Sequence, residues 1–332
     1  MKQTCSIAAA LAPTGALVLT LSGEHLRAIT VAAAQEAAGP VRIYVPFAPG
    51  GPTDVVARIL ADMLTMRWGG RAVIVENRPS AGTIVATAAL AKAPPDGATS
   101  MLATNSFLIN PALDMKLPYD TAKDFVPISM VATQPVALVA NKSFPANTLS
   151  ELIAVAKAAP APLNYTSPGP RGVGHLAGEM LEQRAGIKMT HISYNGSAPA
   201  LTDVIAGRVP LIFDIWHSAR RYVDSGDLKL IAGAGVEPLP GAATTPTIAA
   251  TFPGFNVIAF NAAVGPAGIA PAVLDQLSAD IRAVVASSQF AERTRNLGID
   301  AWGNSPAELE AWMRNEIGKW ARIARDANFK AE

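Results

Sequence analysis

The sequence predicts an α/β protein made of two series of alternating strands and helices. From residue 41 onward, β-branched runs of strand length alternate with runs of helical spacing. Glycine and proline, with 26 residues each among 332, supply turns between short elements. Half of the residues are hydrophobic, so the chain can fill a large core. Alternation of this kind is typical of parallel sheets with helices on their faces.

The first series is expected between residues 41 and 104. β-branched runs bounded by turn residues predict its strands, and apolar residues at helical spacing predict its helices. The expected strands are Val41–Val45, Ala72–Val75 and Ala98–Thr104, and the expected helices are Val55–Met66 and Ile84–Ala91. This βαβαβ order favours a parallel sheet.

Two long segments of strand character separate the first series from the rest of the chain. They lie near residues 128–140 and 255–264, and we interpret them as crossings between two domains. In this layout, residues 36–140 and 255–332 form one lobe. Residues 141–254 form a second lobe that is inserted into the first.

The second series begins with a helix signal. Thr148-Leu-Ser-Glu151 matches a capping box, which predicts a helix from Thr148 to about Ala159. Five strands are then expected at Leu163–Thr166, Met189–Ser193, Leu211–Phe213, Leu228–Ala232 and Phe255–Phe260. The expected helices are His175–Arg184, Pro199–Ala206 and Ser218–Ser225, followed by three tail helices at Pro271–Ser287, Gln289–Leu297 and Pro306–Ala327.

Residues 1–35 have the features of a secretory signal peptide. Lys2 precedes an apolar stretch from Ser6 to Leu21, and the small residues before Gln35 resemble a cleavage site. The stretch is too short and too broken for a good membrane span. We therefore expect export to the periplasm. The single cysteine, Cys5, lies in this segment, so no intrachain disulfide is expected.

The loops that follow strands are the expected binding sites. Ligands of open parallel sheets bind beyond the carboxyl ends of strands, at the N-termini of helices. After the first expected strand, adjacent glycines let a ligand approach the backbone. The candidate contacts there are Phe47, Ala48, Pro49, Gly50, Gly51 and Asp54. A glycine–proline turn with an ordinary helix cap explains them equally well. Asn105 and Ser106 follow the third strand, although turns favour such residues anyway.

The second series offers a glycine-rich loop ahead of a helix. Ser167, Gly169, Arg171 and His175 are its candidate ligand contacts. Arg171 is the one strong cation in these loops, and an arginine binds a carboxylate through two parallel hydrogen bonds. A solvated surface arginine is the alternative. His175 suits either donation to a ligand or packing at the start of the helix.

A further loop and strand end complete the set of candidates. Tyr194, Asn195 and Gly196 follow another strand, and Tyr194 offers a hydroxyl group. Asp214 ends the next strand, where its carboxylate suits a ligand amine or hydroxyl group. A cap for the helix that follows is the alternative role of Asp214.

These loops offer binding groups rather than a recognisable catalytic set. The sequence contains no G-x-S-x-G nucleophile motif and no phosphate-binding loop. Its four histidines lack close metal-ligand spacing, so no metal or cofactor is expected. A net charge of +1 without clustered Lys and Arg argues against a nucleic acid partner. Binding of an anion without turnover is favoured over a hydrolase or isomerase on an α/β scaffold.

Ten short motifs occur in an order that is specific to one family. The motifs are Val45–Asp54, Val75–Pro79, Asp96–Gly97, Leu117–Asp120, Lys123–Phe125, Asn164–Tyr165, His175–Glu179, Gly196–Asp203, Phe213–Asp214 and Pro266–Gly268. On these motifs, which extend over residues 40–328, the chain resembles the tripartite tricarboxylate transporter substrate-binding family. This family is also called the Bug or TctC family.

The resemblance implies a periplasmic-binding-protein fold of type II, the Venus-flytrap architecture with two α/β lobes joined by two crossing strands. It also implies a small carboxylate ligand: a di- or tricarboxylate, an acidic amino acid or an aromatic acid. The candidate loops above are the implied ligand contacts. The implied partners are the two membrane components of a tripartite tricarboxylate transporter, and we expect a monomer. A receptor that feeds a sensor protein without transport is the alternative.

Overall fold

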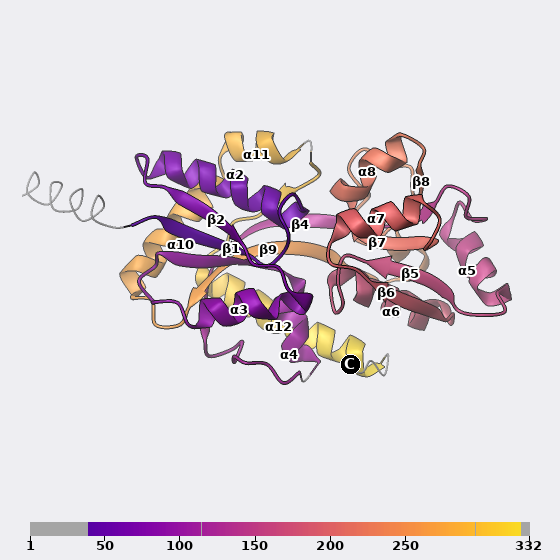
Figure 1. The fold of residues 1–332 in the computed structure, drawn as a ribbon, viewed down its shortest axis with the longest axis horizontal. Coiled ribbons are helices and arrows are strands. Elements are labelled where there is room, and N and C mark those ends of the chain that lie inside the picture. Colours follow the sequence, from indigo (N-terminus) through magenta and orange to yellow (C-terminus); the bar gives the residue numbers. More distant parts are fainter. Residues whose placement is uncertain (1–38, 114, 296, 327–332) are drawn as a thin grey trace, which may run out of the picture. The chain divides into compact units, whose positions relative to one another are not determined.

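The structure is a computed structural model that describes residues 39–113, 115–295 and 297–326. The expected signal peptide, residues 1–35, lies outside the described residues. The chain from Pro40 onward forms one compact unit. Within it, two sets of parallel strands are joined by two strands that run antiparallel to their neighbours (Figure 1).

The first series alternates strands and helices as expected from the sequence. Its elements are β1 (Val41–Val45), α2 (Pro52–Arg67), β2 (Val73–Asn77), the 3₁₀ helix η1 (Ala81–Thr83), α3 (Ile84–Ala91), β3 (Thr99–Ala103) and α4 (Asn105–Ala112). Strand β1 pairs in parallel with β2 on one side and with β3 on the other.

The second series lies between two long strands and is followed by the tail. Strand β4 (Phe125–Asn141) leads into it, and β9 (Ile258–Pro266) leads out of it. Between them lie α5 (Leu149–Ala158), β5 (Leu163–Ser167), α6 (Val173–Ala185), β6 (Met189–Ser193), α7 (Ser197–Ile205), β7 (Leu211–Ile215), α8 (Trp216–Asp224), β8 (Leu228–Gly233) and α9 (Ile248–Thr251). The tail holds α10 (Pro271–Val285), α11 (Ser288–Arg295), β10 (Asp300–Ala301) and α12 (Pro306–Asp326).

Strands β4 and β9 connect the two series. The hydrogen-bonded strands follow the order β2-β1-β3-β9-β4-β7-β5-β6. Residues 125–135 of β4 pair with β9, and residues 136–141 pair with β7 and β8. Strand β9 also pairs with β3. Both segments that the sequence marked as crossings therefore do connect the two series (Figure 1).

The first series is covered on both faces, as alternation along its strands requires. Ile43, Val45 and Leu102 pack in the cluster that contains α2 and α10. Their neighbours Tyr44 and Met101 pack in the cluster that contains α3, α4 and α12. Strands buried on both faces are typical of parallel sheets between helical layers.

The second series has its own core, in which Tyr165, Phe213 and Leu138 are buried together with residues of α5 and α6. Ile212 packs in a separate cluster with residues of α7 and α8. Helix α12 also reaches the first of these cores through Trp320, which is fully buried there. The C-terminal tail therefore packs against the second series as well as the first.

The structure also differs from the sequence-based expectation, and three of the differences concern β4, β9 and α4. Strand β4 runs through Pro135 without a break, because pairing changes there from β9 to β7 and the missing N–H falls at the change. Strand β9 begins at Ile258 rather than Phe255. Helix α4 was not expected, since its Asn105 and Pro111 are typical of turns and its buried residues show no helical period.

Candidate ligand-binding site

The predicted binding loops lie at the carboxyl ends of the parallel strands in both series. Residues 46–51 follow β1 and residues 104–106 follow β3. In the second series, residues 168–172 follow β5, residues 194–196 follow β6, and Asp214 is the penultimate residue of β7. Each of these strand ends is followed by a helix start.

The helices at these strand ends begin without a side-chain cap. Helices α2, α4, α6 and α7 start after Gly51, Thr104, Gly172 and Gly196, and none of these starts is capped by a side chain. Helices α5 and α9, which do not follow the parallel strands of the site, are capped by threonines, whereas α3, α8 and α10 also begin without a side-chain cap. An uncapped helix start presents backbone N–H groups and the positive end of the helix dipole to an anion.

Asp54 holds the loop after β1 in place. Its carboxylate accepts hydrogen bonds from Gly50 N–H at 2.9 Å, Arg58 at 2.8 and 3.0 Å, and Asn77 Nδ2 at 2.8 Å. The side chain of Asn77 also donates to Phe47 O at 3.0 Å. Burial raises the pKa of Asp54, but the hydrogen bonds from Arg58, Gly50 and Asn77 outweigh it and hold the pKa below its usual value. Asp54 is therefore an ionised anchor of the loop.

The anchored loop keeps its backbone accessible. Ala48, Pro49 and Gly50 are exposed, while Phe47 and Gly51 are half-buried. Gly50 has φ of +82°, a conformation that suits glycine. Asn77 was not among the predicted contacts, and its role here is to position Phe47 and Asp54.

Asn105 and Ser106 lie in the first turn of α4, and both are buried. Asn105 Nδ2 donates to Ile258 O at 3.0 Å, and Asn105 Oδ1 accepts from Phe260 N–H at 3.3 Å. The side chain of Asn105 thus binds the crossing strand β9. Ser106 Oγ donates to Arg171 O at 3.5 Å, so this turn meets the loop after β5.

Arg171 belongs to the second series and contacts the first through its side chain as well. A β-carbon on Gly82 would lie 3.3 Å from Arg171 Nη2 and 3.6 Å from Asn110 Oδ1, so the guanidinium occupies space that Gly82 leaves open. The backbone of Arg171 has φ of +54°, which is uncommon outside glycine. Neither Gly82 nor Asn110 was predicted, and no motif in the sequence marked them.

A pair of stacked histidines lies behind the loop after β5. Arg171 N–H donates to His175 Nδ1 at 3.2 Å, which assigns the His175 proton to Nε2. The rings of His175 and His191 stack with centroids 3.7 Å apart. His191 Nε2 lies 2.8 Å from Ser167 Oγ, and Ser167 donates to Gly169 O at 3.0 Å. Three of the predicted residues, Ser167, Arg171 and His175, therefore meet at this histidine pair. His191 was not among the predicted contacts.

The loop after β6 is tied to its surroundings on both sides. Tyr194 donates its hydroxyl hydrogen to Asp203 Oδ2 at 2.5 Å, and this hydrogen bond, followed by burial, raises the pKa of Tyr194. Gly196 N–H donates to Pro168 O at 2.6 Å, which links this loop to the one after β5. Asn195 is exposed. The hydroxyl group of Tyr194 therefore has its hydrogen-bond partner, Asp203, within the second series.

Asp214 is the most buried acid among the predicted contacts, with 1% of its surface exposed. Its Oδ1 accepts from Ser197 Oγ at 2.9 Å and from Ile215 N–H at 2.7 Å. Burial raises the pKa of Asp214 to about 7, against the lowering effect of these two hydrogen bonds.

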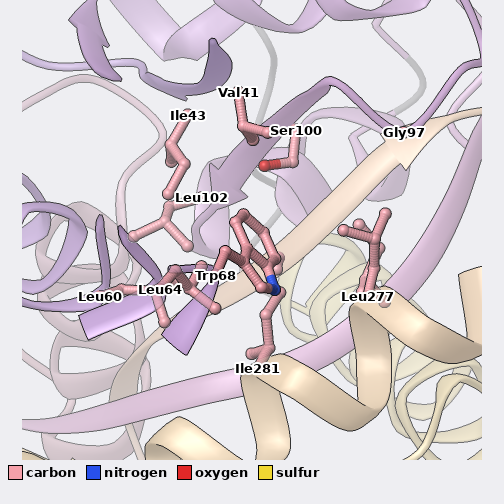
Figure 2. Close-up of a pocket in the computed structure, with 12 residues that line it drawn as sticks. Val41, Ile43, Leu60, Leu64, Trp68, Gly97, Ser100, Leu102, Leu277 and Ile281 are labelled. Atoms are coloured by element: carbon pink, nitrogen blue, oxygen red, sulfur yellow. The ribbon is translucent and has the colours of Figure 1, made fainter. Parts of the chain in front are cut away.

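Two hollows in the structure lie away from these loops. One holds about 10 Å³ under α2 and α10, and Figure 2 shows the Trp68 indole among its mostly aliphatic lining. Its room is about that of one water molecule, too small for an organic acid. A wider hollow of about 250 Å³ is lined by Pro240 and by residues of α11 and β10.

Within residues 39–113, 115–295 and 297–326, no group of three or more His, Cys, Asp or Glu side chains could hold a metal ion. In the same part of the chain, no helix is long and apolar enough to cross a membrane. The chemistry that the described site offers is hydrogen bonding and charge, supplied by helix starts, hydroxyl groups and one guanidinium.

Comparison with known proteins identifies the family. A family model described as "Tripartite tricarboxylate transporter family receptor" matches residues 56–329. The chain belongs to this family. Among solved structures, Rpa4515 of R. palustris with adipate has a TM-score of 0.83 to this receptor at 28% identity, covering 88% of this chain and 98% of its own.

Two further structures resemble this receptor over similar lengths. The periplasmic binding protein BugD is 31% identical, with a TM-score of 0.81, and covers 88% of this chain and 99% of its own. MatC from Rhodopseudomonas palustris with bound malate is 28% identical, with a TM-score of 0.79, and covers 86% and 99%. These likenesses confirm the resemblance seen in the sequence motifs and the predicted two-lobe periplasmic-binding-protein fold. Members of this family are periplasmic solute-binding receptors rather than enzymes.

Proposed function

We propose that this receptor captures a small carboxylate in the periplasm and delivers it to a tripartite tricarboxylate transporter. Rpa4515 holds adipate and MatC holds malate, and both ligands are dicarboxylates. The family description supports the transporter as the partner. Export would depend on residues 1–35.

The uncapped helix starts at the carboxyl ends of the strands carry this proposal. Four helices from two series present their N-terminal N–H groups there, and no side chain caps them. A carboxylate satisfies such groups and is stabilised by the helix dipoles. The contact between Ser106 and Arg171, which brings the turn after β3 against the loop after β5, supports a site shared by loops of both series.

In the proposed mechanism, the carboxylate first binds the backbone of residues 47–51 and the start of α4. Closure of the two lobes about β4 and β9 then brings the second set of contacts over the ligand. This second set consists of Ser167, Gly169, Arg171, His175, Tyr194, Asn195, Gly196 and Asp214. The proposed lobes are residues 36–140 with 255–332, and residues 141–254.

The direct test is a screen of thermal stability with organic acids, in which adipate, malate, citrate, aspartate and benzoate are each paired with the matching amide. Binding to the folded state at a hundred times the dissociation constant stabilises a protein by about 2.7 kcal/mol. For a chain of this size that is a rise of several degrees in Tm. We expect the rise with at least one acid and not with its amide. Equal shifts with acid and amide, or no shift with any acid, would contradict carboxylate capture.

The variant Gly51→Val tests whether the ligand contacts the loop after β1. Gly51→Val places a side chain where the nearest other atom to a β-carbon is 3.7 Å away, so the free protein should keep its Tm. The larger side chain should block backbone contact and remove the shift. Gly318→Val, at an open position on α12, is the control and should leave the shift intact. Persistence of the shift in Gly51→Val would move the ligand away from this loop.

A further inference from the structure

Asp214 has one carboxylate oxygen whose hydrogen-bonding capacity is unused. Its Oδ1 accepts from Ser197 Oγ and Ile215 N–H. Its Oδ2 is buried and has no hydrogen-bond partner among the residues that the structure describes. An ionised carboxylate in this position would leave its charge buried with one oxygen unsatisfied, which is strongly unfavourable.

The groups around Asp214 do not neutralise it. None of the ion pairs found among the described residues includes Asp214. On α8, burial and then Arg221 lower the pKa of His217, which favours the neutral imidazole. On β6, burial and then His175 lower the pKa of His191 to about 3, so that ring is neutral as well. Several other titratable groups on the neighbouring loops and helices have partners of their own. They are Arg171, His175 with Glu179, Tyr194 and Arg208 with Asp203, Arg220 with Asp224, and Arg221 with Tyr222.

We propose that Asp214 is a carboxylic acid when an anion occupies this site, so that capture of the anion near neutral pH is coupled to proton uptake at Asp214. The inference rests on the proposed function, which places the anion among the loops that surround this residue. An anionic ligand beside an ionised Asp214 would be repelled, and the low dielectric of the interior strengthens that repulsion. A proton from solvent forms an O–H bond on Oδ2, while Oδ1 keeps both of its donors.

The coupling has a definite sign. In the free protein, Asp214 is partly ionised near neutral pH because burial places its pKa at about 7. An anion in the site raises the pKa of Asp214 further, so the complex binds more protons than the free receptor. Affinity should therefore be constant below pH 7, down to the pH at which the ligand's own carboxylates take up protons. It should fall as pH rises above 7, by up to tenfold for each pH unit.

The variant Asp214→Asn tests whether proton uptake on binding occurs at Asp214. Asparagine can keep both hydrogen bonds at Oδ1, and its Nδ2 replaces the protonated oxygen as a donor. We expect calorimetric titration of wild-type protein with adipate and with malate, at pH 7.5 in two buffers of different ionisation enthalpy, to show proton uptake. Asp214→Asn should bind the same acid with an affinity that does not change between pH 6 and 9, and without proton uptake. Glu182→Gln removes a half-buried acid of α6 whose pKa burial also raises to about 7, and it should retain the uptake.

A measurement without ligand tests the charge state separately. The infrared spectrum of wild-type protein at pH 6, minus that of Asp214→Asn, should contain a carboxylic acid C=O band that disappears at alkaline pH. Absence of the band at pH 6 overturns the inference. Binding with no proton uptake, or with proton release, also overturns it while the proposed function stands. If no acid binds, the proposed function fails and the coupling fails with it.

Discussion

At the scale of single residues, several predicted ligand contacts prove to have partners inside the chain. Asp54 accepts four hydrogen bonds from Gly50, Arg58 and Asn77. The amide of Asn105 binds β9. Such residues shape the binding loops, so their effect on a ligand is exerted through the backbone that they position.

Replacement of Asp54 by Asn tests this role. The variant loses the charge that Arg58 and Gly50 N–H contact, and hydrogen bonds to a charged group contribute about 1.5–3 kcal/mol each. We expect urea denaturation to show a loss of at least about 2 kcal/mol in the free energy of unfolding. The ligand that shifts the wild-type Tm should also bind more weakly, since residues 47–51 lose their anchor.

Asp62 on the same helix is the matched control for Asp54. It forms an exposed ion pair with Arg293 at 2.9 Å, and exposed pairs contribute about 0–1 kcal/mol. Asp62→Asn should therefore leave both stability and affinity nearly unchanged. If the two variants behaved alike, the anchoring role of Asp54 would be wrong.

The sequence predicted the strand-to-helix loops of the proposed site better than it predicted the contacts of each side chain. Turn residues after a strand are visible locally, which is why the glycine-rich segments were found. The surroundings of the Arg171 side chain were not visible, because Gly82 lies in η1 and Asn110, which donates to Gly82 O, lies in α4, and both are ordinary residues in sequence. The role of Asp54 had two interpretations, and only the positions of Arg58 and Asn77 distinguish them.

At the scale of elements, helix α6 packs closely on strand β5 because Gly178 has no side chain. A β-carbon there would lie 2.2 Å from Tyr165 Cε2, and Tyr165 is fully buried. The hydroxyl group of Tyr165 donates to His175 O at 3.0 Å, on the same helix. This contact fixes the height of α6 above the sheet and with it the loop that carries Arg171.

Two glycine-to-alanine changes separate packing from helix propensity. In a helix interior, alanine is favoured over glycine by about 1 kcal/mol. Gly178→Ala should nevertheless lower the free energy of unfolding by about 1–3 kcal/mol or more, since overpacking of a core outweighs propensity. Gly318→Ala on α12, where a β-carbon meets nothing within 4 Å, should raise it by about 0.5–1 kcal/mol. Chemical denaturation of both variants, compared with wild type, provides the measurement. A stabilised Gly178→Ala would show that Tyr165 moves aside freely.

Element types were predictable wherever periodicity was strong. The capping box at Thr148 predicted the start of α5, and Thr148 Oγ1 does accept from Glu151 N–H at 3.2 Å. The same reasoning missed α4, because a helix buried on nearly all sides has no polar face to reveal its period. Tertiary packing, rather than local preference, makes residues 105–112 helical.

At the scale of the whole molecule, β4 and β9 join the first series to the second, and they do so with polar side chains in their interior. Gln134 Nε2 donates to Asn261 Oδ1 at 2.7 Å, and Asn261 Nδ2 donates to Thr53 Oγ1 at 3.2 Å, with all three residues buried. Thr53 lies in the first turn of α2. The crossing strands are thus linked directly to a helix start of the proposed site. The sequence revealed the crossings by their length, whereas this network depends on pairing between residues more than 100 positions apart.

Global stability should depend on pH through His191, which is half-buried and stacks on His175 in the second series. Burial, followed by the effect of His175, lowers the pKa of His191 to about 3, from an ordinary value near 6.5. The unfolded chain therefore takes up a proton at His191 as pH falls through 6.5, while the folded chain does not until about pH 3. This contribution to stability is complete above pH 6.5. It is lost at about 1.4 kcal/mol per pH unit below that value.

His191→Gln removes this titration, because glutamine cannot be protonated in this range. We expect the free energy of unfolding of wild type, relative to His191→Gln, to fall by roughly 2–3 kcal/mol between pH 6.5 and 4.5. Asp214 and Glu182, whose pKa values burial raises to about 7, act in the opposite direction, but they titrate in both proteins and cancel in the difference. Urea denaturation at pH 4.5, 5.5, 6.5 and 7.5 measures the two curves. Parallel curves would mean that His191 is protonated as readily in the folded chain as in the unfolded one, and that the stacked pair opens to water.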